Sequence, residues 1–298
     1  MVQQRFKGTG VALVTPFLNG AIDFEALNHI IEHTIRGKVD FLVSLGTTGE
    51  SVTLSVEEMQ EILSFTVKTV AGRVPVVAGM FGDNNTARLL KRFDEINLDG
   101  VDAIMSSNPA YNKPSQEGIF QHYMALADAS PLPIIIYNVP GRTSSHVQPK
   151  TILRLAQASD KFIAVKEASG DVLQASQILK NRPEGFLVLS GDDPTALAHM
   201  GVGGDGVISV IGNAYPAEFS GMIRAALNND YKEAQQLHAL LLDMHHWLYV
   251  DCNPAGIKTV LAEMGLGSTE VRLPLVPASE NTAAGIRAEM QRIKDAQA

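Results

Sequence analysis

Short apolar runs alternate with amphipathic stretches along most of this chain. Most of the runs consist of consecutive apolar residues and do not alternate with polar ones, which is typical of parallel strands covered by helices. They predict strands at residues 11–15, 41–45, 75–78, 101–105, 134–137, 162–166, 186–189 and 206–210. The segments between them have apolar residues at helical spacing, for example at 57–70 and 86–96. Strands and helices are therefore expected to alternate in a regular order.

This even repetition favours one fold class. Eight strand–helix units match a closed (β/α)8 TIM barrel better than a doubly wound sheet. After Pro216 the pattern becomes purely helical, for example at residues 231–249 and 257–264. We therefore predict an α/β protein with a catalytic barrel over residues 1–228 and a C-terminal helical extension over residues 229–298.

Composition and charge exclude several classes of function. The chain has 298 residues, of which 45% are hydrophobic, so it can bury a large core. A net charge of −8 leaves no basic surface for nucleic acid. One cysteine, Cys252, excludes an internal disulfide framework, and no apolar run approaches the ~18 residues of a membrane span. Since the first residues also lack a processing site, we expect a cytoplasmic protein with no nucleic-acid or membrane partner.

Lys166 is the most informative residue, because it ends the apolar run at 162–165, whereas the other lysines are expected in polar or loop contexts. Burial disfavours the charged form of an amine. A neutral amine can condense with a keto acid to a Schiff base, which makes or breaks a C–C bond without a metal. The alternative is a lysine that leaves the strand end to reach a carboxylate.

The strand at 41–45 leads into the sequence GTTGES. In barrels of this kind the active site lies at the C-terminal ends of the strands. Two glycines permit a tight turn there, and the hydroxyls of Thr47 and Thr48 stand beside exposed N–H groups, as in a small carboxylate site. The alternative is a glycine turn followed by a helix that Ser51 or Ser55 caps.

The strand at 134–137 ends in YNVPGR, which places Tyr137 and Arg142 on the same rim. A phenol can shuttle protons, and a guanidinium can bind a carboxylate through two parallel hydrogen bonds. The alternatives are a rim aromatic with a satisfied hydroxyl and a solvated loop charge. The proline-bounded loop at 108–114 presents Tyr111, and exposed loop aromatics more often serve interfaces than catalysis.

Two acidic residues, Asp192 and Asp193, follow the strand at 186–189. Barrels that bind phosphate use the loops after the last two strands, where these charges would repel it. No third metal ligand lies nearby, so we predict neither a metal nor a cofactor. Capping of the helix at Pro194 is the expected use of this pair.

The motifs GTTGES, YNVPGRT and VKEASG, in this order, resemble the dihydrodipicolinate synthase family of pyruvate-dependent class I aldolases. The same superfamily includes N-acetylneuraminate lyase. YNKPSQEG, LSGDD, GVISV and RLPL extend the resemblance over nearly the whole chain. It implies condensation of pyruvate with L-aspartate 4-semialdehyde to 4-hydroxy-tetrahydrodipicolinate, in lysine and diaminopimelate biosynthesis, without a cofactor.

The resemblance also implies roles for individual residues. Lys166 would form the imine with pyruvate, and Tyr137 would act as the acid and base beside it. Thr47 would join Tyr137 to Tyr111 in a hydroxyl relay, and in the family a neighbouring subunit donates the tyrosine at this last position. The active unit would therefore be a homo-oligomer, at least a dimer and, as is usual in the family, a tetramer.

Three further residues would bind substrates. Thr48, together with Thr47, would hold the pyruvate carboxylate, and the main chain of Ile208 would border the keto acid. Arg142 would bind the carboxylate of the semialdehyde. One alternative is an aldolase for N-acetylneuraminate or a 2-keto-3-deoxy sugar acid, enzymes that do not generally carry this arginine. The other is a catalytically idle keto-acid-binding scaffold.

The chain departs from the family at the pocket that binds inhibitory lysine. Family members that lysine inhibits line this pocket with histidines, a glutamate and a tyrosine. The corresponding residues here are Val56, Met59, Arg88 and Ala110, in an alignment that includes a loop one residue longer near residues 82–85. An ammonium would lose its carboxylate partner, so we predict weak or absent inhibition by L-lysine.

Overall fold

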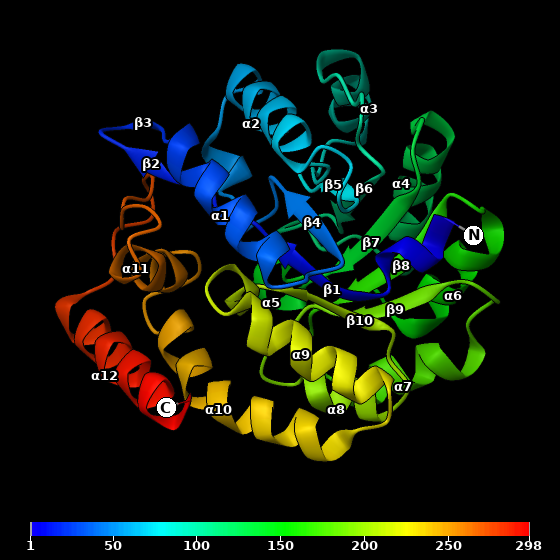
Figure 1. The fold of residues 1–298 in the computed structure, drawn as a ribbon. Helices are drawn as coiled ribbons and strands as arrows, with labels where there is room; N and C mark the ends of the chain where they lie inside the picture. Colours follow the sequence, from blue (N-terminus) through cyan, green and yellow to red (C-terminus); the bar gives the residue numbers. More distant parts are fainter. Residues whose placement is uncertain (1, 298) are drawn as a thin grey trace.

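The computed structural model describes residues 2–297 and contains a closed barrel of eight parallel strands (Figure 1). The strands are β1 (Gly8–Ala12), β4 (Phe41–Ser44), β5 (Val76–Ala78), β6 (Ala103–Ser107), β7 (Ile134–Asn138), β8 (Phe162–Glu167), β9 (Leu187–Ser190) and β10 (Gly206–Ser209). Neighbours follow the order β1-β10-β9-β8-β7-β6-β5-β4, and β4 pairs with β1 to close the barrel. The predicted (β/α)8 barrel is confirmed.

The first strand lies three residues before its predicted position. β1 begins at Gly8, because its glycines allow a close approach that an apolar pattern does not reveal. A Cβ on Gly10 would lie 2.2 Å from the Phe41 ring of the neighbouring strand. A small hairpin of β2 (Phe17–Leu18) and β3 (Ala21–Ile22) follows and was not predicted, since two-residue strands are too short to show alternation.

Helices cover the outside of the barrel. They are α1 (Phe24–Arg36), α2 (Val56–Val70), α3 (Thr86–Glu95), α4 (Gln116–Ala129), α6 (Pro149–Ala158), α7 (Val172–Asn181), α8 (Ala196–Gly201) and α9 (Pro216–Leu227), while the single-turn α5 (Pro140–Thr143) lies at the end of β7. Their apolar faces pack on the outward side chains of the strands and form the main core. At α2, Ser55 and Glu58 form a capping box. Of the two candidate caps, Ser51 and Ser55, the structure therefore uses Ser55.

A second apolar cluster fills the inside of the barrel. Its members alternate with the outward residues along the strands and include several bulky ones, among them Phe41, Met105, Ile135 and Leu189. The short 3-10 helix η1 (Val2–Phe6) adds Phe6, whose ring meets the edge of Phe41 at 5.6 Å between ring centres. These contacts fill the barrel at the N-terminal ends of the strands, opposite to the predicted site.

Three helices form the C-terminal extension: α10 (Tyr231–Tyr249), α11 (Ala255–Glu263) and α12 (Glu280–Gln297). The predicted helices at 231–249 and 257–264 are confirmed, whereas the division into two domains at residue 228 stays a prediction. In Figure 1 the orange loop that follows α11 lies next to the blue β2–β3 hairpin, and Ser268 of this loop donates a hydrogen bond to the Phe17 carbonyl. No helix within residues 2–297 has the length and apolar character needed to cross a membrane.

Candidate active site

The barrel brings Lys166 and Tyr137 together. They are register partners on β8 and β7, so their side chains project from the same face of the sheet. Lys166 is 5% exposed, and its Nζ lies 4.4 Å from the centre of the Tyr137 ring. Gly191, just after β9, leaves room for the lysine, because a Cβ there would lie 2.9 Å from Lys166 Cε. The predicted pairing of an amine with a phenol is thus present in a single chain.

Glu167 fixes the end of β8 from the opposite face. Its carboxylate accepts hydrogen bonds from the side chains of Asn138 and Gln174, at 2.8 and 2.7 Å, and from the Ser169 N–H at 2.9 Å. Within residues 2–297 no acidic side chain forms an ion pair with Lys166. The lysine therefore does not reach for a carboxylate, and the acid beside it in VKEASG, which the sequence analysis did not single out, is used to hold the strand.

The GTTGES turn lies over the barrel as predicted. Thr47 lines a cavity of about 510 Å³ together with Tyr137 and Ser107. Thr48 is buried, and its Oγ1 accepts a hydrogen bond of 3.0 Å from Asn253 Nδ2. A Cβ on Gly79 would lie 2.8 Å from the Cα of Gly46, so this turn packs against the end of β5. The turn thus brings Thr47 to the same cavity as the phenol of Tyr137, while Thr48 is buried against Asn253.

Arg142 and Ile208 lie on other parts of the rim. Arg142 belongs to the single-turn helix α5, directly after β7, and its side chain is exposed. No acidic residue among residues 2–297 pairs with its guanidinium, which leaves the guanidinium available to an anion. Ile208 is fully buried in β10, in the same interior cluster as Tyr137 and Leu189.

Tyr111 points away from the body of a single chain. Its side chain is 89% exposed, and its backbone adopts a left-handed conformation with φ of 64°. Its N–H donates to the carbonyl of Thr143 at 2.9 Å, which ties the loop to α5. The cavity lined by Thr47 and Tyr137 does not include Tyr111. The relay is therefore not assembled within one chain.

The acidic pair after β9 differs from its predicted use. Only Asp192 acts near α8, where it accepts hydrogen bonds from the N–H and hydroxyl of Thr195. Asp193 is buried, and its Oδ2 accepts from the N–H groups of Val210 and Ile211, both at 2.8 Å, so it joins the ends of β9 and β10. Burial raises the pKa of Asp193 to about 6. Capping by both residues, as the sequence suggested, is wrong for Asp193.

A second buried lysine contradicts the expectation that every lysine other than Lys166 lies in a polar or loop context. Lys258 in α11 is 1% exposed, and its Nζ donates to Glu50 Oε1 at 2.5 Å. Its helix is buried on every side over most of its length, since Ala255 through Leu261 are all buried. A lysine within a mostly apolar segment was the available signal. It was missed because a helix that is buried on all sides has no amphipathic pattern by which to recognise a buried charge.

The fold and these side chains define a barrel enzyme with a buried lysine at the end of its sixth barrel strand. Residues 5–293 match the model of the Dihydrodipicolinate synthetase family, and the chain belongs to this family. It is 47% identical to 4-hydroxy-tetrahydrodipicolinate synthase of Parabacteroides distasonis, over 98% of this chain and 99% of that protein. The resemblance drawn from the three motifs is confirmed.

Solved structures agree with this assignment. The chloride-inhibited dihydrodipicolinate synthase of Acinetobacter baumannii, complexed with pyruvate, is 36% identical, with a TM-score of 0.93 over 97% of this chain and 99% of that one. The enzyme of Cyanidioschyzon merolae with lysine bound is 33% identical, with a TM-score of 0.93 over the same shares of the two chains. The chain thus matches enzymes of this family over nearly its full length.

Proposed function

We propose that this site forms an imine between Lys166 and pyruvate and then condenses pyruvate with L-aspartate 4-semialdehyde. The product is 4-hydroxy-tetrahydrodipicolinate, a precursor of lysine and diaminopimelate. The family membership supports the reaction. The observation that carries the mechanism is the burial of Lys166 beside Tyr137 without an acidic partner.

The chemistry begins with the neutral amine of Lys166, which attacks the ketone carbon of pyruvate. The carbinolamine loses water to give the imine, and loss of a proton from C3 gives an enamine. C3 then attacks the aldehyde carbon of the second substrate, whose oxygen takes up a proton. Finally the amino group of that substrate attacks the imine carbon, closes the ring and releases Lys166.

Tyr137 is the acid and base of this scheme, because its ring lies directly beside the amine. Thr47 faces the same cavity as Tyr137 and is assigned to the proton relay. Thr48 and Thr47 bind the pyruvate carboxylate with their hydroxyls and backbone N–H groups, and the main chain of Ile208 borders the keto acid. Arg142 binds the carboxylate of the semialdehyde.

The active unit is a homo-oligomer, at least a dimer and, in our proposal, a tetramer. Tyr111 is largely exposed although its loop is anchored at Asn108, whose amide donates to Ser145 and Thr143. An anchored loop that presents an exposed aromatic fits an interface with a second copy. We place this enzyme in the cytoplasm, since Cys252 has no second cysteine with which to form a disulfide within the chain.

The substrates are tested directly with the purified protein. We expect turnover when pyruvate and L-aspartate 4-semialdehyde are supplied together, and no release of pyruvate from N-acetylneuraminate or a 2-keto-3-deoxy sugar acid. A coupled assay run in parallel on these substrates measures both. Cleavage of a sugar acid without condensation would reverse the assignment, and activity on neither would favour a binding scaffold.

Replacing Arg142 with Ala should raise the KM for the semialdehyde about 10- to 100-fold, because a hydrogen-bonded charge pair with the substrate carboxylate is lost. The KM for pyruvate should change little. Steady-state kinetics with each substrate varied in turn separate the two effects, and Lys150→Ala, which removes an exposed cation from α6, is the control. Equal losses for both substrates would contradict the specificity role.

Two inactive variants should restore each other if Tyr111 acts in the partner's site. In a mixed dimer of Tyr111→Phe and Lys166→Ala chains, the Tyr111→Phe chain keeps its lysine and receives an intact tyrosine from the other chain. Random exchange makes half of the dimers mixed, so about a quarter of the wild-type activity is expected. Activity is measured after dissociation and reassembly. No recovery, despite mixed dimers seen by mass spectrometry, would place Tyr111 in its own chain's site.

L-Lysine should inhibit this enzyme weakly or not at all. Met59 and Arg88 line the 510 Å³ cavity, whereas Val56 and Ala110 do not. The cavity does contain one carboxylate, Asp83, but Arg88 binds it with two hydrogen bonds of 2.7 and 2.8 Å. Although burial acts to raise the pKa of Asp83, Arg88 holds it below its usual value. A steep fall of activity at sub-millimolar lysine in an inhibition curve would refute this.

A further inference from the structure

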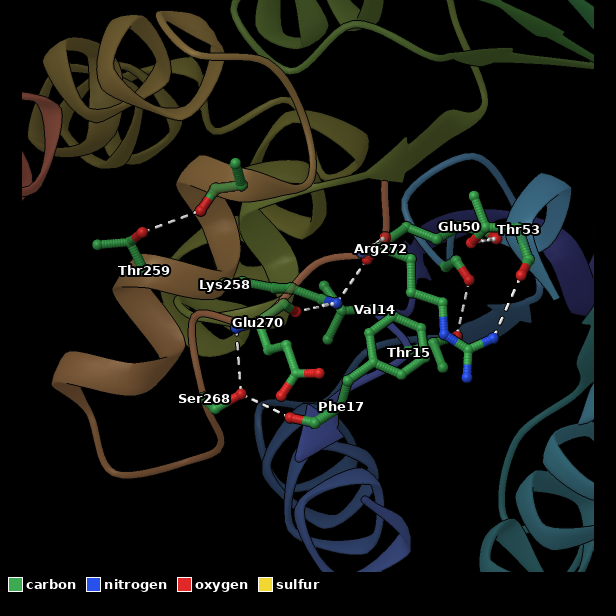
Figure 2. A network of polar contacts seen from close by, with 12 residues as sticks. Val14, Thr15, Phe17, Glu50, Thr53, Lys258, Thr259, Ser268, Glu270 and Arg272 are labelled. Carbon is green, nitrogen blue, oxygen red and sulfur yellow. Dashed lines mark hydrogen bonds and ion pairs between the residues drawn. The ribbon is translucent and has the colours of Figure 1, made fainter. Parts of the chain in front are cut away.

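A buried ion pair links the C-terminal extension to the GTTGES turn (Figure 2). The side chains of Lys258 and Glu50 are each 1% exposed, and their charged atoms are 2.5 Å apart. Lys258 also donates to the Glu270 carbonyl at 2.8 Å, and Glu50 Oε2 accepts from the Arg272 N–H at 2.9 Å. Burial lowers the pKa of Lys258, and Glu50 opposes that shift. Since desolvation offsets most of the attraction in such a pair, stability alone is a weak reason for its presence.

Glu50 occupies a demanding position in the turn. Its backbone is left-handed with φ of 52°, a conformation in which glycine would fit without strain. Its N–H donates to the Thr47 carbonyl at 3.0 Å, and the Gly49 N–H donates to the Gly46 carbonyl at 3.1 Å. Thr47 and Thr48 therefore lie inside two overlapping turns. The side chain of Glu50 ties these turns to Lys258.

Asn253, between α10 and α11, makes a second contact with the same turn. Its Nδ2 donates to Thr48 Oγ1 at 3.0 Å, and its Oδ1 is buried with no partner within residues 2–297. A hydroxyl has one proton to donate and two lone pairs with which to accept. Because Asn253 occupies a lone pair, the proton of Thr48 remains available to an acceptor on the other side. A carboxylate is such an acceptor.

We propose that the C-terminal extension positions the pyruvate carboxylate site of the barrel, with Asn253 setting the Thr48 hydroxyl as a donor and Lys258 holding the turn through Glu50. Asn253 and Lys258 are positioning residues in this account, since both act through the turn. The inference rests on the proposed function, in which Thr47 and Thr48 bind the carboxylate. It gives a role to the contacts that Asn253, Lys258 of α11 and Arg272 make with this turn.

Two substitutions at Asn253 separate positioning from simple packing. In Asn253→Asp the carboxylate can only accept hydrogen bonds, so the Thr48 hydroxyl donates to it. The hydroxyl then presents a lone pair to pyruvate, and the aspartate adds a negative charge nearby. We expect the KM and calorimetric Kd for pyruvate to rise about 10- to 100-fold in Asn253→Asp and less than about 10-fold in Asn253→Ala. The KM for the semialdehyde should stay within about twofold. A packing role alone predicts the opposite order, because the aspartate keeps the shape of the asparagine.

The ion pair is tested with its charges removed together. A single Lys258→Met change leaves Glu50 buried and unpaired and can prevent folding, whereas Glu50→Gln combined with Lys258→Met keeps the interior neutral. We expect this double variant to unfold near the wild-type temperature and to bind pyruvate about 10-fold more weakly. Lys232→Met, which removes an exposed lysine from α10, should change neither quantity.

The two series give a clear decision. Folded Asn253→Asp and double variants that bind pyruvate as tightly as the wild type would overturn the proposal. If the double variant does not fold, the order of the two Asn253 variants decides alone. Failure of the proposed function would look different, since the wild-type protein itself would then show no pyruvate binding in the calorimeter.

Discussion

The pairing of β7 with β8 at the carboxyl edge of the barrel is the constraint on which the site depends. Their register sets Tyr137 opposite Lys166, and the alternation of a strand then turns the next residue, Glu167, to the other face. The hydrogen bonds of Glu167 to Asn138 and Gln174 hold this edge against α7. A shift of one residue would exchange the inward lysine for the outward glutamate and remove the nucleophile from the barrel.

The two buried lysines have different environments, and this difference distinguishes the structural lysine from the proposed nucleophile. Lys258 donates to a buried carboxylate and a carbonyl, so its charge is compensated and it serves to hold a turn. Lys166 Nζ lies 4.4 Å from the centre of the Tyr137 ring, and no acidic side chain within the described residues forms an ion pair with it. Lys166 can therefore attack a ketone without first breaking an ion pair, whereas Lys258 could not.

The sequence predicts the parts of this structure that follow from periodicity. Eight continuous apolar runs predict the barrel, and the convergence of strand ends in such a barrel places Lys166 and Tyr137 near each other. The start of β1 escaped prediction because Gly8 and Gly10 have no side chain to contribute to a pattern. Lys258 escaped because its helix is buried on all sides. The position of Tyr111 in an active site needs a second chain, which no single-chain pattern describes.

Capture of pyruvate by the amine at the end of β8 is the central claim, and borohydride reduction in the presence of pyruvate tests it most directly. The intact mass should increase by one reduced pyruvate adduct per chain, and peptide mapping should locate the adduct on Lys166. Without pyruvate the mass should not change. An unchanged mass with pyruvate, or an adduct on Lys258 or another side chain, would contradict the account.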